Sequence, residues 1–126
     1  MNVAVFDTGL EANHPHFKNI IERIDYTSEK NADDLIGHGT FVAGVIASSR
    51  DCLGLAPQSN LYIFKVFTKN QVSYTSWFLE AFNHAIRKKI DVLNLSIGGP
   101  DFMASEFIEC IEIINLYLVN VGHAIC

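Results

Sequence analysis

Hydrophobic residues in this chain alternate between short dense runs and longer stretches with helical spacing. The dense runs are bounded by Gly, Pro, Asn or Asp, which is typical of strands buried on both faces of a sheet. They predict strands at 3–6, 61–67, 92–97 and 116–121. Stretches in which apolar residues recur every three or four positions predict helices at 39–49, 75–88 and 106–115. The first of these helices is expected to begin at His38.

The order of these elements favours an α/β fold. Strand and helix alternate along the chain, and a strand that returns to the same sheet through a helix does so by a right-handed crossover. The expected architecture is therefore a parallel sheet with helices on both faces. Residues 9–37 are polar and irregular, so we expect mostly loop there, with a short strand near 24–27. The sequence shows no internal repeat or linker, and we expect one domain or a part of one.

The helix predicted at 39–49 contains both large and small apolar residues. The large ones form a stripe that is expected to face the core. They are Phe41, Val42, Val45 and Ile46. The small ones allow a neighbouring segment to approach closely. They are Ala43, Gly44 and Ala47.

Composition and charge narrow the class of protein. The 126 residues are 49% hydrophobic, which supports a packed core. A formal net charge of -5 and a pI near 5.4 argue against a nucleic-acid partner, because phosphate binding needs clustered Lys and Arg. No basic leader followed by an apolar stretch opens the sequence, and no segment reaches the ~18 apolar residues of a membrane span. We therefore expect no membrane segment in this chain.

The spacing of cysteine and histidine argues against a metal site. Cys52, Cys110 and Cys126 are odd in number and lack the spacing of zinc ligands, so no disulfide framework is expected and their redox state stays open. His14 and His16 flank a proline, but two histidines without further spaced ligands are more typical of a surface loop. The residues therefore indicate no metal ion and no cofactor.

Two short motifs carry candidate chemistry. Residues 3–9 close a buried strand with Asp7 in an Asp-Thr-Gly turn, and N–H groups of such a turn at the carboxyl end of a strand are expected to keep the acid ionised. Residues 37–44 place His38 at the start of a predicted helix, where the positive end of the helix dipole favours a neutral base. The glycines on either side of His38 are expected to let substrate and partner groups approach its ring. The motifs thus supply two of the three groups of a Ser-His-Asp triad, namely the two that activate the serine.

A third segment, residues 94–99, offers a place for a peptide. It ends the strand predicted at 92–97 with little side-chain bulk, and it includes Ser96, Ile97 and Gly98. Backbone N–H and C=O groups at such a strand end can pair with an extended peptide as an added strand. The expected partner is therefore a peptide or protein substrate in extended conformation.

These segments resemble the motifs of the subtilisin-like serine proteases. Residues 6–9 are similar to the aspartate motif of that family, 38–44 to its histidine motif and 93–99 to its substrate-binding strand. Residues 54–57 also match the segment that lies between them. The resemblance covers roughly residues 2–108 and fades beyond them. The whole chain, 1–126, therefore resembles the N-terminal portion of a subtilisin-like peptidase domain, with that fold incomplete.

The resemblance implies a role for each segment. It implies Asp7 as the acid that orients the base, His38 as the general base, and Ser96, Ile97 and Gly98 as peptide-binding backbone. Many members of the family bind calcium, but no residues of this chain can be identified as calcium ligands.

Four segments are similar to one branch of the family, whose members release membrane-bound transcription factors in the ER and Golgi of the secretory pathway. They are residues 14–19, 37–47, 71–79 and 91–102. This narrower resemblance implies cleavage after non-basic residues when an arginine lies a few positions upstream. Asp33 and Asp34 precede His38 and would suit a basic substrate group, but a solvated loop is the simpler interpretation.

The chain departs from the family at the nucleophile. Subtilisin-like proteases carry it in a Gly-Thr-Ser-x-Ala-x-Pro segment, and nothing in the 126 residues matches that segment. Ser105 lies in a polar connection, and Ser48 and Ser49 end the helix that begins at His38. The oxyanion asparagine of the family is expected after the last strand, where residues 120–124 read Asn-Val-Gly-His-Ala. We therefore predict that this chain is inactive alone.

Two other interpretations stay open. One treats residues 1–126 as a non-catalytic truncated fragment, or as a half-domain that binds a peptide or partner protein through an exposed sheet edge. The other starts from the Asp-Thr-Gly at Asp7, which is also typical of retroviral-type aspartic proteases that share two such aspartates in a homodimer. Those proteases are all-β, so the helical spacing at 39–49 and 75–88 argues against them.

Overall fold

The computed structural model describes residues 1–96 and 117–119. The helix predicted at 106–115 lies outside the described residues, and so do Ile97, Gly98, Ser105, Cys110, Cys126 and the expected oxyanion turn at 120–124.

Five strands of the described residues form one sheet. In chain order they are β1 (Asn2–Asp7), β2 (Ile20–Asp25), β3 (Asn60–Lys65), β4 (Val92–Leu95) and β5 (Tyr117–Val119). Their order across the sheet is β2-β3-β1-β4-β5, and every pairing is parallel. The predicted parallel sheet is therefore confirmed, and it excludes the all-β aspartic protease.

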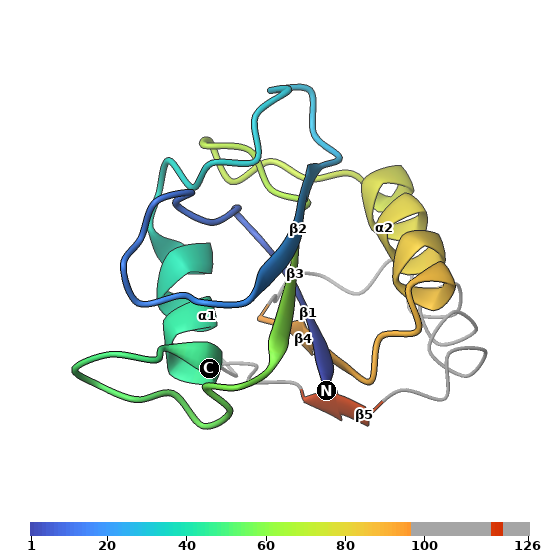
Figure 1. Cartoon of the computed structure of the whole chain (residues 1–126). Helices are drawn as coiled ribbons and strands as arrows, with labels where there is room; N and C mark the ends of the chain where they lie inside the picture. Colours follow the sequence, from blue (N-terminus) through green and yellow to red (C-terminus); the bar gives the residue numbers. More distant parts are fainter. Residues whose placement is uncertain (97–116, 120–126) are drawn as a thin grey trace, which may run out of the picture.

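Helices cover both faces of this sheet, as predicted (Figure 1). α1 (His38–Ala47) connects β2 to β3 on one face, and α2 (Thr75–Arg87) connects β3 to β4 on the other. A β-α-β unit of this kind returns the chain to the same end of the sheet, so both helices start near the carboxyl ends of the strands. Neither helix is long and apolar enough to cross a membrane.

The core consists of one hydrophobic cluster on each face of the sheet. Successive side chains of a strand point to opposite faces. Val3 and Val5 of β1 accordingly pack in the cluster that contains α1, and Ala4 and Phe6 pack in the cluster that contains α2. All four side chains are buried. β1 is therefore held from both faces up to its last residue, Asp7.

The short strand predicted near 24–27 begins earlier than expected. β2 pairs with β3 from Ile20 to Asp25. It is an edge strand with mostly half-exposed residues, so it lacks the dense apolar run that marks a buried strand. It ends where the carboxylate of Asp25 accepts hydrogen bonds from the backbone N–H and the hydroxyl of Thr27, which turns the chain.

The buried face of α1 differs from the predicted stripe. Its buried residues are Gly39, Ala43 and Ala47. By contrast, Phe41 is 69% exposed and Val45 is 50% exposed, so the expectation that these two face the core is wrong. Val42 and Ile46 pack partly against the cluster. The helix lies so close to the neighbouring backbone that its contact face accepts small residues alone, and the larger ones are displaced to its sides.

Candidate active site

The helical connections change from one face of the sheet to the other at β3, which lies next to β1. β1 lies between β3 and β4. α1 leads into β3 on one face, and α2 leads from β3 to β4 on the other. Such a switch point is where open α/β sheets place their ligands. Asp7 is the last residue of β1 and is buried there.

The structure brings together the carboxylate and the imidazole of the two motifs. His38 is the first residue of α1, and its Nδ1 lies 2.7 Å from Oδ1 of Asp7. The Asp7 side chain is 2% exposed and that of His38 is 50% exposed. Because Nδ1 faces the buried acid, Nε2 is the ring nitrogen available to a reacting group. In this arrangement a carboxylate fixes the tautomer and orientation of a catalytic imidazole.

Burial dominates the electrostatics of Asp7. Loss of solvation raises the pKa of its carboxyl above the ordinary value of 3.8. Hydrogen bonds from His38 and from the backbone N–H of Thr8, the latter 2.7 Å long, oppose this rise. The turn therefore supplies the expected N–H donor, but its effect is smaller than that of burial. Oδ2 of Asp7 is also buried, with no hydrogen-bond partner among the described residues.

Thr8 links the two motifs through its side chain. Its hydroxyl accepts a hydrogen bond from the backbone N–H of Gly39 at 2.9 Å and donates one to Oδ1 of Asp34 at 2.8 Å. Thr8, which follows Asp7, is thus hydrogen-bonded to Gly39, which follows His38. This contact fixes the start of α1 against the end of β1.

Gly39 allows α1 to begin directly against the turn that follows Asp7. A Cβ atom at Gly39 would lie 2.2 Å from the carbonyl oxygen of Gly9, far inside any normal contact. Gly39 therefore serves the packing of the chain against its own backbone. Gly37, on the other side of His38, has a φ of 99°, and a Cβ there would meet nothing within 4 Å. Glycine is needed at position 37 because the backbone there is left-handed, a conformation that glycine adopts without strain.

No serine of residues 1–96 forms a hydrogen bond with His38. Ser48 and Ser49 follow the last residue of α1, where their hydroxyls donate to the carbonyls of Arg50 and His16. They lie at the opposite end of the helix from His38, as expected. The absence of a nucleophile from the whole chain stays a prediction from the sequence.

The described part of the expected peptide-binding segment is Ser96. It follows β4, and its hydroxyl accepts a hydrogen bond from the side-chain amide of Asn94 at 2.8 Å. β4 pairs with β1 up to Leu95 and with β5 up to Asn94. Ser96 is therefore the first residue whose backbone lies beyond both pairings.

Within the described part of the chain, no three His, Cys, Asp or Glu side chains gather as a metal-binding group. His16 instead contacts Asp51 through Nε2 at 3.1 Å and the hydroxyl of Ser48 through Nδ1 at 3.3 Å. Cys52 is exposed with a free thiol.

Sequence reasoning missed two residues beside this site, Asp34 and Lys65. Asp34 is not a solvated loop residue, because its carboxylate accepts hydrogen bonds at the start of α1. Its position three residues before Gly37 was the available signal, since helix-capping carboxylates lie just ahead of a helix. Lys65 is completely buried, and its signal was a lysine inside a dense apolar run, where an unpaired charge is rarely tolerated.

This fold, with an acid at the end of β1 and an imidazole at the start of α1, is typical of a class of serine-type proteases. A model of the subtilase family, peptidase S8, matches residues 1–120. The chain therefore belongs to the subtilase family, and the resemblance found in its motifs is confirmed.

Individual relatives narrow the comparison. The membrane-bound transcription factor site-1 protease of Homo sapiens is 69% identical over 109 residues, which cover 86% of this chain and 10% of that protein. The subtilisin-like protease SBT6.1 of Arabidopsis thaliana is 57% identical over 110 residues, covering 86% of this chain and 11% of that protein. The intracellular serine protease of Paenibacillus polymyxa is 37% identical over 110 residues, which cover 80% of this chain and 34% of that protein. The narrower resemblance is thus confirmed, and the chain spans about a tenth of the length of the first two relatives.

Proposed function

We propose that this chain supplies the acid and the base of a subtilisin-like serine endopeptidase. The observation that carries the proposal is the 2.7 Å contact between His38 Nδ1 and Asp7 Oδ1. Membership of the subtilase family supports it. Asp7 orients the imidazole and stabilises the imidazolium, and His38 is the general base.

The proposed reaction is acyl transfer to a serine followed by hydrolysis. Nε2 of His38 takes the proton of the serine hydroxyl as its oxygen attacks the scissile carbonyl, and gives that proton to the amine as the C–N bond breaks. In the second half, His38 takes a proton from the attacking water and returns it to the serine oxygen. Asp7 stays beside Nδ1 throughout, so the same tautomer is restored after each step.

Residues 1–126 are proposed to form the N-terminal portion of a peptidase domain. The family match to residues 1–120 supports this, and so does the small share of each relative that the chain covers. The serine is assigned to sequence outside these 126 residues, because the Gly-Thr-Ser segment of the family has no counterpart in them. The chain alone is therefore proposed to be inactive.

The proposed substrate is a peptide in extended conformation, bound along Ser96, Ile97 and Gly98. The position of Ser96 just beyond the paired part of β4 supports this, since an extended peptide can add to free backbone groups. The name of the human relative points to membrane-bound transcription factors as substrates. The resemblance to that relative also makes the secretory pathway the proposed place of action.

The first test is an assay of the purified chain with fluorogenic peptides that carry an arginine upstream of a non-basic cleavage residue. We expect no hydrolysis above buffer, because in subtilisin loss of the serine alone lowers turnover roughly a million-fold. Hydrolysis that disappears in His38→Ala would show that the chain is active by itself.

The second test is a chimera in which residues 1–108 replace the aligned segment of an active relative. We expect an active protease whose kcat falls about ten-thousand-fold with Asp7→Asn and roughly a million-fold with His38→Ala. His14→Ala is the matched control. It also removes an imidazole, but one whose ring packs on His16 and Phe17 and not on Asp7. An active chimera that tolerates His38→Ala would overturn the assignment of the base.

A further inference from the structure

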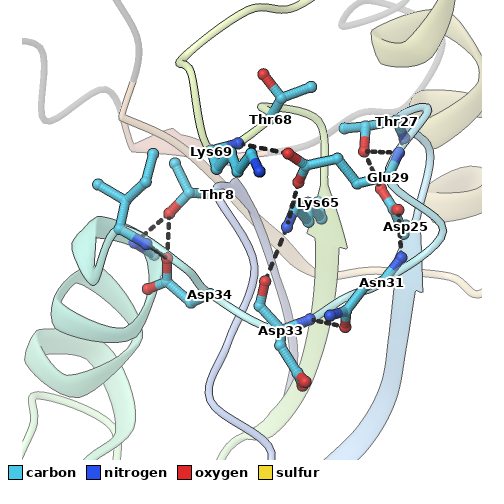
Figure 2. Close-up of polar contacts among 12 residues, drawn as sticks. Thr8, Asp25, Thr27, Glu29, Asn31, Asp33, Asp34, Lys65, Thr68 and Lys69 are labelled. Carbon is cyan, nitrogen blue, oxygen red and sulfur yellow. Dashed lines mark hydrogen bonds and ion pairs between the residues drawn. The ribbon is translucent and has the colours of Figure 1, made fainter.

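The loop between β2 and α1, residues 26–37, sets where α1 begins. Figure 2 shows that groups from this loop meet Thr8, which follows β1, and Lys65 at the end of β3. Hydrogen bonds therefore tie the loop to both strands beside the Asp7–His38 pair.

The carboxylate of Asp34 accepts five hydrogen bonds, one from the residue that follows β1 and four from around the beginning of α1. Oδ1 accepts from the hydroxyl of Thr8 at 2.8 Å, from the N–H of Ile36 at 3.1 Å and from the N–H of Gly37 at 2.9 Å. Oδ2 accepts from the N–H and the hydroxyl of Thr40, at 2.8 and 2.7 Å. Both oxygens are thus used, and each reaches the beginning of α1.

These contacts cap α1 from outside the helix. The N-cap residue is Gly37, which has no side chain to accept the N–H groups of the first turn. Asp34 accepts the N–H of that N-cap residue and the N–H of Thr40, the third residue of the helix. A carboxylate in this place satisfies the first turn and fixes its direction.

We propose that Asp34 is a positioning residue for the Asp7–His38 pair. Its carboxylate holds the turn of helix that carries His38, and through Thr8 it holds the residue next to Asp7. Asp34 acts through these neighbours and makes no hydrogen bond with either member of the pair in the described structure. The inference rests on the proposed function, because it assigns Asp34 to the alignment of that acid and base.

Buried Lys65 anchors the backbone on which Asp34 depends. Its Nζ donates to the carbonyl of Asp33 at 2.8 Å and pairs with Oε2 of Glu29 at 2.9 Å (Figure 2). Oε1 of Glu29 in turn accepts the N–H of Lys69. The peptide unit before Asp34 is therefore held by the ammonium group of Lys65, and the side chain of Lys65 is itself fixed by its burial.

A small displacement of α1 would separate the pair. The contact of 2.7 Å between Nδ1 and Oδ1 is short, and such hydrogen bonds weaken beyond about 3.2 Å. Asp7 cannot follow a moving helix, because β1 is buried on both faces. A shift of about 1 Å in a catalytic group is enough to lower a rate substantially.

The test is proton NMR of the full 126-residue chain near neutral pH, which detects the Nδ1–H proton of His38 in its hydrogen bond with Asp7. We expect a strongly deshielded, slowly exchanging signal in the native chain and its loss in Asp34→Ala. Asp25→Ala is the matched control. Asp25 is a carboxylate of the same region that accepts hydrogen bonds from Thr27 and Asn31 and none from α1, so this variant should keep the signal.

A second pair of variants decides the case if Asp34→Ala does not fold. Thr8→Val removes the hydroxyl between Asp34 and Gly39 and should lose the signal, whereas Thr8→Ser keeps the hydroxyl and should retain it. A folded Asp34→Ala that keeps the signal would overturn the inference about Asp34, and so would a Thr8→Val that keeps it. Absence of the signal from the native chain would overturn both this inference and the proposed acid–base pair. Failure of the chimera alone would overturn the proposed function while the NMR result stands.

Discussion

Asp7 and Asp34 are two carboxylates whose surroundings shift their pKa values in opposite directions. Burial raises the pKa of Asp7. Burial would also raise that of Asp34, but hydrogen bonds from Thr40, Gly37 and Thr8 outweigh it and lower the pKa. The candidate catalytic acid therefore weakens the fold when ionised, whereas its supporting acid strengthens it. Functional residues often show this conflict between activity and stability.

Asp7→Asn is expected to raise the free energy of unfolding at neutral pH. The raised pKa means that the folded chain loses stability as the pH rises from 3.8 through the folded-state pKa, and asparagine has no charge to desolvate. The gain should vanish below pH 3.8. Urea unfolding across pH 3 to 7 measures it, and a variant less stable than the native chain at pH 7 would contradict the dominance of burial.

Asp34→Ala is expected to lower the free energy of unfolding by about 2 kcal/mol at neutral pH, because a helix cap is lost. The pKa of Asp34 is lowered in the folded state, so its contribution is present above pH 3.8 and is lost as the pH falls through the folded-state pKa. The native chain and the variant should therefore converge in acid. Thermal unfolding as a function of pH checks this, and a difference that grows in acid would refute it.

At the scale of elements, α1 is placed by close backbone contact on one side and by a buried ion pair beneath its preceding loop. Gly39 meets Gly9 at the end of β1, and Lys65 of β3 holds Asp33 and Glu29 of the loop. Neither contact depends on a large apolar side chain. Backbone shape and polar pairing therefore fix the start of this helix, in addition to the packing of its later residues in the hydrophobic cluster.

Gly39→Ala is expected to destabilise the chain by about 3 kcal/mol, because its Cβ would overlap the carbonyl oxygen of Gly9. Gly44→Ala is the matched control in the same helix. A Cβ at Gly44 meets nothing within 4 Å, so the higher helix propensity of alanine should stabilise the chain by about 1 kcal/mol. Denaturant unfolding compares the two variants, and equal effects would contradict the close contact.

Lys65→Met is expected to cost about 3 kcal/mol, because Glu29 would keep its charge without its buried partner. The pairing with Lys65 lowers the pKa of Glu29. Adding Glu29→Gln to Lys65→Met should restore part of the loss, since no unpaired charge then remains. A double-mutant cycle of unfolding free energies measures this coupling, and strictly additive effects would show that the pair contributes nothing.

At the scale of the whole molecule, β3, β1 and β4 lie in the interior of the described sheet and β2 lies at its edge. Both faces of β1 are covered by the clusters beneath α1 and α2. Amide hydrogen exchange should therefore be slowest in β1 and β3 and faster in β2, whose residues are largely half-exposed. Mass spectrometry or NMR measures these rates, and slower exchange in β2 than in β1 would contradict this arrangement.

Much of the fold was predictable because buried parallel strands are marked by dense apolar runs, and β1, β3 and β4 carry them. The edge strand β2 was harder to place, since half-exposed residues carry a weaker pattern. The stripe on α1 was assigned to the wrong face in part, because periodicity counts apolar residues and takes no account of how closely a neighbour approaches. The sequence around Lys65 does not reveal its role, because the partners of this buried charge come from a distant loop.

The sequence alone determined the class of fold, the family and the two chemical groups, because hydrophobic period and local motifs are properties of neighbouring residues. Tertiary structure decided whether those groups meet. Asp7 and His38 are 31 residues apart in sequence, and their contact of 2.7 Å exists because parallel crossovers return both residues to the same end of the sheet. Tertiary structure likewise decided the role of Asp34. Its carboxylate accepts hydrogen bonds from Thr8, after the end of β1, and from Thr40, near the start of α1, and these two segments meet only when the chain folds.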